Sequence, residues 1–202
     1  MELENSSLYP DICHRILEDL AQKLPSYLTY HCLEHTLDVA NVCNRYIDYY
    51  MVAEPVARLI RIAAVAHDYG YIYGPKDHEE RSITEVRPML TDYSEKEIAL
   101  VEGLIRATKV PQYPRNLYEE ILADADLDYL GRGDYEPLSD LLYKEFLHFG
   151  VVKNPEEWVQ VQIRFLEGHA YHTDWAIRHR VAEKKKVLEA LRAQVVTPPE
   201  KG

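Results

Sequence analysis

The stretch Ile62-Ala63-Ala64-Val65-Ala66-His67-Asp68 decides how this chain can fold. Its consecutive apolar residues indicate a buried segment, and Glu54-Pro55 upstream is a typical helix start, so a core helix should end at the His-Asp pair. A histidine and an aspartate that close a buried helix are costly to desolvate. Metal coordination is one of the few arrangements that offset this cost.

The apolar pattern is helical over nearly the whole chain. Its spacing predicts helices at residues 8–24, 31–50, 54–68, 78–90, 94–107, 116–130, 135–149, 155–170 and 173–194. Glycines and a proline mark residues 69–77 as a loop. No stretch alternates with a period of two for long. We therefore expect an all-α fold, one single-domain helical bundle over residues 1–195, followed by a frayed tail at 196–202.

The bulk composition narrows the class of function. A chain of 202 residues with 47% hydrophobic and 28% charged residues is ordinary for a soluble globular domain. The net charge of -11 argues against a nucleic acid polymer or an anionic membrane as partner. No apolar run reaches the roughly 18 residues of a transmembrane helix. Three cysteines without CxxC spacing and an acidic N-terminus predict a cytoplasmic protein with reduced thiols.

Two histidines precede the core helix. His31 and His35 are four residues apart on a predicted helix, so both can face one site. An isolated pair with this spacing is more often a surface feature, but Tyr30 beside it and the His-Asp pair one helix later favour a site. The pair itself has a structural alternative, because a helix C-terminus favours a histidine cation and aspartate is common in the following turn.

Carboxylates follow in the sequence ILADADLDYLG at residues 121–131. Asp124 and Asp128 are i,i+4 neighbours, whereas Asp126 shares its helical phase with apolar positions such as Leu122 and Leu130. That setting favours Asp126 as an inward-facing ligand, with Asp124 as the competing candidate.

The ordered set of His35, His67-Asp68 and a later aspartate resembles the HD-domain superfamily of metal-dependent phosphohydrolases, over roughly residues 28–131. The resemblance implies that His35, His67, Asp68 and Asp126 bind the metal and that Asp68 also takes part in catalysis. His31 matches a position at which some phosphodiesterase-like members place a proton donor. His78 matches a histidine that members with two metals use for the second ion, although a solvated helix start is an equally good interpretation.

The ligand types indicate the metal and the reaction. Two histidines and two carboxylates suit Mn, Fe, Ni, Co or Zn better than Ca, and Mg also stays open. Such an ion lowers the pKa of bound water, which can then attack phosphorus. We expect hydrolysis of a small phosphorylated substrate, a phosphate ester or a nucleotide.

Weaker signals and alternatives accompany this interpretation. Arg106 and Thr108, and also His169 and Thr173, are candidate substrate-binding residues, although a polar helix junction explains the second pair as well. An HD domain without turnover that acts as a ligand-binding or regulatory module is one alternative. A di-iron oxygenase ranks lower, because only His78 offers an extra histidine ligand. A helical bundle with incidental histidines and a homodimer also stay open.

Overall fold

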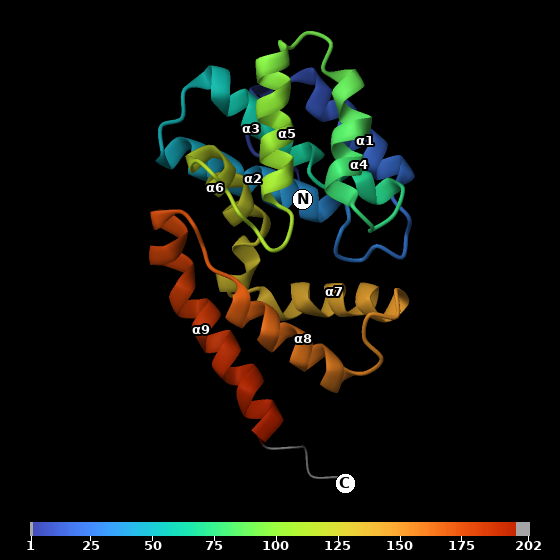
Figure 1. The fold of residues 1–202 in the computed structure, drawn as a ribbon, viewed down its shortest axis with the longest axis vertical. Helices are drawn as coiled ribbons and strands as arrows, with labels where there is room; N and C mark the ends of the chain where they lie inside the picture. The colour runs from blue at the N-terminus through green and yellow to red at the C-terminus, as the bar shows by residue number, and fades with distance from the viewer. Residues whose placement is uncertain (1, 197–202) are drawn as a thin grey trace. The chain divides into compact units, whose positions relative to one another are not determined.

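The computed structural model describes residues 2–196, and over these residues the protein is helical, which confirms the predicted all-α class. This part of the chain contains nine α-helices and four short 3-10 helices and no strand (Figure 1). The α-helices are α1 (Asp11–Lys23), α2 (Leu33–Tyr49), α3 (Glu54–Ala66), α4 (His78–Val86), α5 (Glu95–Ala107), α6 (Leu117–Asp126), α7 (Tyr135–His148), α8 (Pro155–Gly168) and α9 (Asp174–Val196). The 3-10 helices are η1 (Ser6–Leu8), η2 (Tyr69–Ile72), η3 (Arg87–Met89) and η4 (Asp128–Gly131).

Two predicted boundaries are wrong in ways that matter for the site. The helix predicted at 116–130 ends at Asp126, and η4 follows it. Acidic side chains at a helix C-terminus oppose the helix dipole, which is consistent with an early end. The helix predicted to begin at 31 begins at Leu33, because Cys32 is extended, with φ -113° and ψ 178°.

The chain divides into two compact units, the first ending at Asp126 and the second beginning at Leu127. Helices α1 to α6 lie in the first unit and α7 to α9 in the second. The expectation of one domain over 1–195 stays a prediction. Helix α9 includes Val196, and the rest of the tail predicted to be frayed lies outside the described residues.

Helix α3 is the core of the first unit. Helices α1, α2, α5 and α6 all pack against it. Every residue from Leu59 to Tyr71 is buried, including Arg61, which bonds to Asn44 and Glu54. Ala63, Ala64 and Ala66 have no exposed surface, and their small side chains let the neighbouring helices approach closely. This packing delivers the end of α3, with His67 and Asp68, into the interior.

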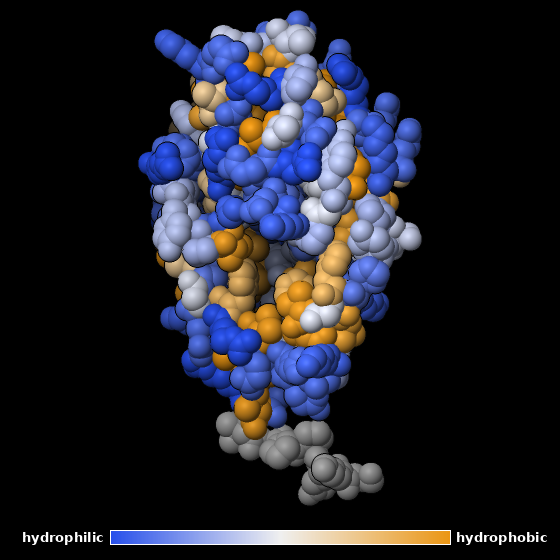
Figure 2. Space-filling view, turned by 45° about the vertical axis from the view of Figure 1, so that its right-hand side comes forward, coloured by the Kyte–Doolittle hydropathy of each residue, from blue (hydrophilic) through white to orange (hydrophobic). Residues whose placement is uncertain are grey.

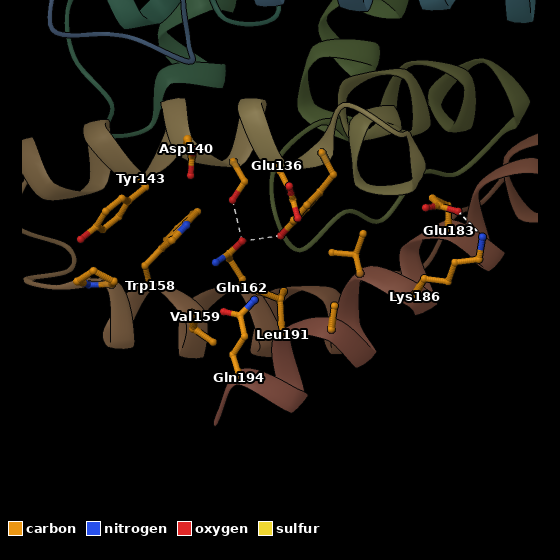
Figure 3. Close-up of a pocket in the computed structure, with 15 residues that line it drawn as sticks. Glu136, Asp140, Tyr143, Trp158, Val159, Gln162, Glu183, Lys186, Leu191 and Gln194 are labelled. Carbon is orange, nitrogen blue, oxygen red and sulfur yellow. Dashed lines mark hydrogen bonds and ion pairs between the residues drawn. The ribbon is translucent and has the colours of Figure 1, made fainter. Parts of the chain in front are cut away.

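The second unit is organised around α9. Helix α8 and η4 pack against it, and Arg180 forms a bidentate ion pair with the buried Asp128, with N–O distances of 2.8 and 3.2 Å. A groove of about 510 Å³ is lined by residues of α7, α8 and α9 (Figure 3). Gln162, one of the lining residues, accepts hydrogen bonds from the hydroxyls of Tyr135 and Ser139. None of the residues predicted for the metal site lines this groove.

Hydrophilic side chains predominate on the face shown in Figure 2, with apolar patches among them. Met51 and Tyr113 are among the large apolar residues that are exposed in the first unit. Within the described residues, no helix is both long and apolar enough to cross a membrane. The three cysteines, Cys13, Cys32 and Cys43, are free thiols.

Candidate metal centre

Three helix ends deliver the predicted ligands of the first unit to one place. His35 lies in the first turn of α2, and His67 and Asp68 form the step from α3 into η2. Asp126 is the last residue of α6. Helix α3 contacts both α2 and α6, so the donors come together through the packing of the core.

The donor atoms lie close to one another. His35 Nε2 is 3.4 Å from His67 Nε2 and 3.4 Å from Asp68 Oδ2, and His67 Nε2 is 3.3 Å from the same oxygen. Two donors that bind one ion at about 2.1 Å are separated by about 3.0 to 3.4 Å when the angle at the ion is octahedral or tetrahedral. The observed spacing therefore fits a shared divalent ion.

Asp126 extends this group from the other side. Its Oδ1 lies 3.3 Å from His35 Nε2 and 3.5 Å from His67 Nε2. Among the described residues, however, the set whose donor atoms all lie within 4.8 Å of one another comprises His35, His67 and Asp68. Asp126 thus reaches both histidines, and its role as a ligand stays a prediction.

A hydrogen bond orients the ring of His67, the first residue of the His67–Asp68 doublet, toward the centre. The Nδ1 of His67 lies 2.8 Å from the carbonyl oxygen of Ala64, which can only accept, so Nδ1 carries the proton in the neutral ring. The Nε2 lone pair then faces the centre. Asp68 Oδ2 is buried without a hydrogen-bond partner among the described residues. A buried orphan oxygen beside two imidazole nitrogens is what a cation site requires.

The centre has a strong affinity for positive charge. Burial lowers the pKa of His67, but the carboxylates of Asp68 and Asp126 outweigh this effect and raise that pKa well above its usual value. Burial raises the pKa values of Asp68 and Asp126, but nearby histidines outweigh this effect and lower both. A proton would therefore compete with a metal ion for these donor atoms.

The other oxygen of Asp68 faces a different histidine. Asp68 Oδ1 lies 3.2 Å from Nε2 of His78, the first residue of α4, whose Nδ1 faces the carbonyl oxygen of Pro75 at 3.2 Å. The buried carboxylate of Glu79 lies 3.6 Å from the same Nε2. Asp68 thus lies between the His35–His67 pair and His78.

Gly70 and Ser82, to which sequence analysis assigned no role, hold α4 against the doublet. The Ser82 hydroxyl donates to the carbonyl oxygen of His67 at 2.8 Å and accepts from the Gly70 amide at 2.7 Å. A Cβ atom on Gly70 would meet the carbonyl oxygen of His78 at 2.1 Å. Only a glycine permits this approach, and a glycine two residues after Asp68 was the one signal in the sequence.

His31 reaches the site in a way that differs from the prediction. It precedes α2 instead of sharing a helical face with His35, yet their ring centroids are 5.9 Å apart. The ring of His31 stacks on Tyr71 of η2, with a centroid distance of 4.2 Å and an interplanar angle of 14°. Sequence analysis missed Tyr71, because an aromatic residue in a predicted loop has no periodicity that marks it.

The two aspartates of α6 have different surroundings. Asp124 is fully buried, whereas the side chain of Asp126 keeps 14% of its surface exposed and faces the histidines. Asp126 is thus the aspartate whose carboxylate lies near the histidines, and its assignment as the ligand in place of Asp124 stays a prediction.

The predicted substrate-binding residues of the first unit make other contacts. Arg106 forms a bidentate ion pair with Glu80 at 2.8 and 3.1 Å and also contacts Glu102. The hydroxyl of the buried Thr108 donates to the carbonyl oxygen of Ile105. Arg106 would have to leave Glu80 to bind a phosphate.

His169 and Thr173 lie in the second unit. The Thr173 hydroxyl accepts a hydrogen bond from the Ala176 amide at the start of α9. The Nδ1 of His169 lies 3.3 Å from the ammonium nitrogen of Lys184. These contacts support the alternative of a polar helix junction, and a role in substrate binding stays a prediction.

Comparison with known proteins adds no family assignment. No protein-family model matches the chain, and no curated protein matches it with significance.

Proposed function

We propose that this protein is a metal-dependent phosphohydrolase of the HD-domain type that acts on a small phosphate ester or nucleotide. The observation that carries the proposal is the convergence of His35 Nε2, His67 Nε2 and Asp68 Oδ2 within 3.3 to 3.4 Å of one another in the interior. The ordered motif around these three residues supports it independently.

The donor set indicates which group the site would hold. Two imidazoles and one or two carboxylates suit a divalent ion of intermediate hardness, such as Mn, Fe, Co, Ni or Zn, and Mg stays open. When bound, such an ion supplies an activated water and neutralises charge on a phosphate oxygen. His35, His67 and Asp68 would hold it, with Asp126 as the fourth ligand.

His31 has the position of a proton donor in this scheme. Its ring lies beside His35 but contributes no atom to the closely spaced donor set. A histidine is suited to protonate a leaving oxygen near neutral pH, a contribution of about 100- to 10,000-fold in rate. In this proposal His35, His67 and Asp68 bind the ion, whereas His31 faces the leaving group and donates the proton.

The test is a hydrolysis screen with metal-stripped protein. Phosphomonoesters, phosphodiesters and nucleotides are offered with each divalent ion added back singly. We expect turnover that depends on the ion, that is abolished in His67→Ala and that persists in His14→Ala, a matched change at an exposed histidine of α1. Stoichiometric metal without turnover of any substrate would favour the regulatory alternative. Absence of bound metal after loading would refute the proposal.

A second ion is a further candidate, and Asp68 is the residue that favours it. Its Oδ2 faces the His35–His67 pair, while Oδ1 faces His78 at 3.2 Å, so Asp68 and His78 would hold the second ion. Elemental analysis should then give two ions per chain in the unmodified protein and one in His78→Ala. Oxygen consumption by the iron-loaded protein would move the assignment to the di-iron oxygenase.

A further inference from the structure

Tyr71 contacts two histidines of the proposed site with one ring. Its centroid lies 4.2 Å from that of His31, nearly parallel to it, and 4.3 Å from that of His78 at an interplanar angle of 37°. The two histidines come from segments far apart in the sequence, and their own centroids are 6.5 Å apart. Tyr71 is therefore the shared neighbour of the predicted proton donor and of the candidate ligand for a second ion.

The backbone of Tyr71 is fixed relative to the metal ligands. Its amide donates to the carbonyl oxygen of Asp68 at 3.0 Å, and the preceding amide, of Gly70, is bound by Ser82. The side chain is buried, with 6% of its surface exposed. The ring is thus a buried platform whose backbone belongs to the same turn as Asp68.

His31 has no comparable support from secondary structure. It lies in the bend before α2 and is only partly buried. Its centroid lies 4.2 Å from that of Tyr71, in a nearly parallel stack, and 4.9 Å from that of Tyr30, which is edge-on. A parallel stack restrains the plane of the imidazole, and the nitrogen atoms lie on the ring edge, outside the stacked faces.

We propose that Tyr71 is a positioning residue, whose ring holds the imidazole of His31 in the orientation that protonates the leaving group. The inference rests on the proposed phosphohydrolase function, because it assigns His31 a step of that reaction. It is the aromatic face of Tyr71 that acts, so a phenylalanine should replace it and a leucine should not.

The kinetic test compares Tyr71→Phe and Tyr71→Leu on two substrates, a nucleoside monophosphate and p-nitrophenyl phosphate. Nitrophenolate leaves without a proton, so it reports on hydrolysis that does not need His31. We expect Tyr71→Phe to behave like the unmodified protein. Tyr71→Leu should lower kcat for the nucleotide by part of the ~100- to 10,000-fold that general acid catalysis contributes, with little change for p-nitrophenyl phosphate. Equal loss on both substrates would overturn the proposal.

Tyr69→Leu is the matched control. Tyr69 is also a buried tyrosine of η2, but its hydroxyl donates to Asp19 of α1 at 2.7 Å instead of facing the site. The control should lower thermal stability about as much as Tyr71→Leu and leave the ratio of the two activities unchanged. Metal content is measured for each variant, so that loss of an ion is separated from misplacement of His31.

A second readout is independent of activity. Stacking on Tyr71 should shift the imidazole proton resonances of His31 upfield through the aromatic ring current, and His31→Ala assigns these resonances. The upfield shift should persist in Tyr71→Phe and Tyr69→Leu and disappear in Tyr71→Leu. If it persists in Tyr71→Leu, the positioning role is wrong. If the shift disappears in Tyr71→Leu while the unmodified protein hydrolyses no phosphate ester, Tyr71 does hold the His31 ring but the proposed function is wrong.

Discussion

Asp68 Oδ2 lies 3.3 Å from Nε2 of His67, although side chains of adjacent residues usually point apart. The backbone makes this possible, because His67 keeps helical angles and Asp68 adopts φ -101° and ψ 9° at the step into η2. The end of one buried helix thus presents a nitrogen and an oxygen to the same point. Because two predicted ligands are consecutive residues, the proposed metal centre depends on this single turn.

The first prediction concerns metal and stability. A ligand that binds only the folded state stabilises it, by about 2.7 kcal/mol at a concentration 100 times its Kd. Addition of Mn or Zn should therefore raise the melting temperature of the unmodified protein and of His14→Ala but not that of His67→Ala. Differential scanning calorimetry with and without metal measures the difference. An equal rise in His67→Ala would place the ion elsewhere.

The second prediction concerns the neutral and alkaline pH range. Because the pKa of His67 is raised in the folded state, its contribution to stability is fully present below about pH 6.5, the value for an unperturbed histidine. That contribution is lost as the pH rises through the folded pKa. Each unit by which the folded and unfolded pKa values differ is worth about 1.4 kcal/mol.

The metal-free protein should therefore lose stability as the pH rises above about 6.5, while metal affinity increases over the same range because protons no longer compete. The lowered pKa values of Asp68 and Asp126 act in the opposite direction. Their stabilisation is lost only as the pH falls from about 4 through the folded values. Urea unfolding at a series of pH values, with and without metal, measures both the loss of stability above about pH 6.5 and the loss below about pH 4.

The third prediction distinguishes the two aspartates of α6. Asp126→Asn should weaken metal binding by tenfold or more, because the Asp126 oxygen faces both histidines. Changes to residues that only hydrogen-bond a metal ligand already lower metal affinity by roughly tenfold. Asp124→Asn should keep the affinity and lower the unfolding free energy by about 1–3 kcal/mol, since a fully buried polar group changes its hydrogen bonding. Isothermal titration calorimetry and urea unfolding measure the two effects. The reverse pattern would make Asp124 the ligand.

Sequence pattern was sufficient for the features that depend on local periodicity. The apolar run before His67 predicted a buried helix ending at the doublet, and the structure has α3 end at Ala66. Helical phase also favoured Asp126 over Asp124 as the ligand, and this choice stays a prediction, because Leu130, which helped to set the phase, lies beyond the end of α6. Within one helix, a fixed rotation per residue determines which side chains share a face.

Contacts that depend on tertiary packing could not be predicted from the sequence. Arg106 was a candidate for substrate binding, which stays a prediction, but its ion pair with Glu80, 26 residues away on another helix, was not foreseen. His31 was expected on the face of a helix, and instead it precedes α2 and its ring stacks on Tyr71, from a different segment. Neither contact produces a periodic pattern in the sequence, because each joins residues from different segments whose spacing along the chain follows no helical repeat.

The last prediction concerns the glycine that follows the doublet. In Gly70→Ala the new Cβ would meet the carbonyl oxygen of His78 at 2.1 Å, so backbone has to move. Overpacking of this kind typically costs about 1–3 kcal/mol. The movement should also separate His78 from Asp68 Oδ1, which is now 3.2 Å away, and so remove any second ion while His35 and His67 keep the first.

Gly133→Ala is the matched control, since nothing lies within 4 Å of a Cβ atom at that position. It should leave both stability and metal content close to those of the unmodified protein. Urea unfolding and elemental analysis of the two variants, side by side, measure the effect. If Gly70→Ala unfolds at the same urea concentration as Gly133→Ala and keeps the same metal content, α4 can retreat from the doublet without consequence. The close approach of α4 would then not be what holds His78 at Asp68.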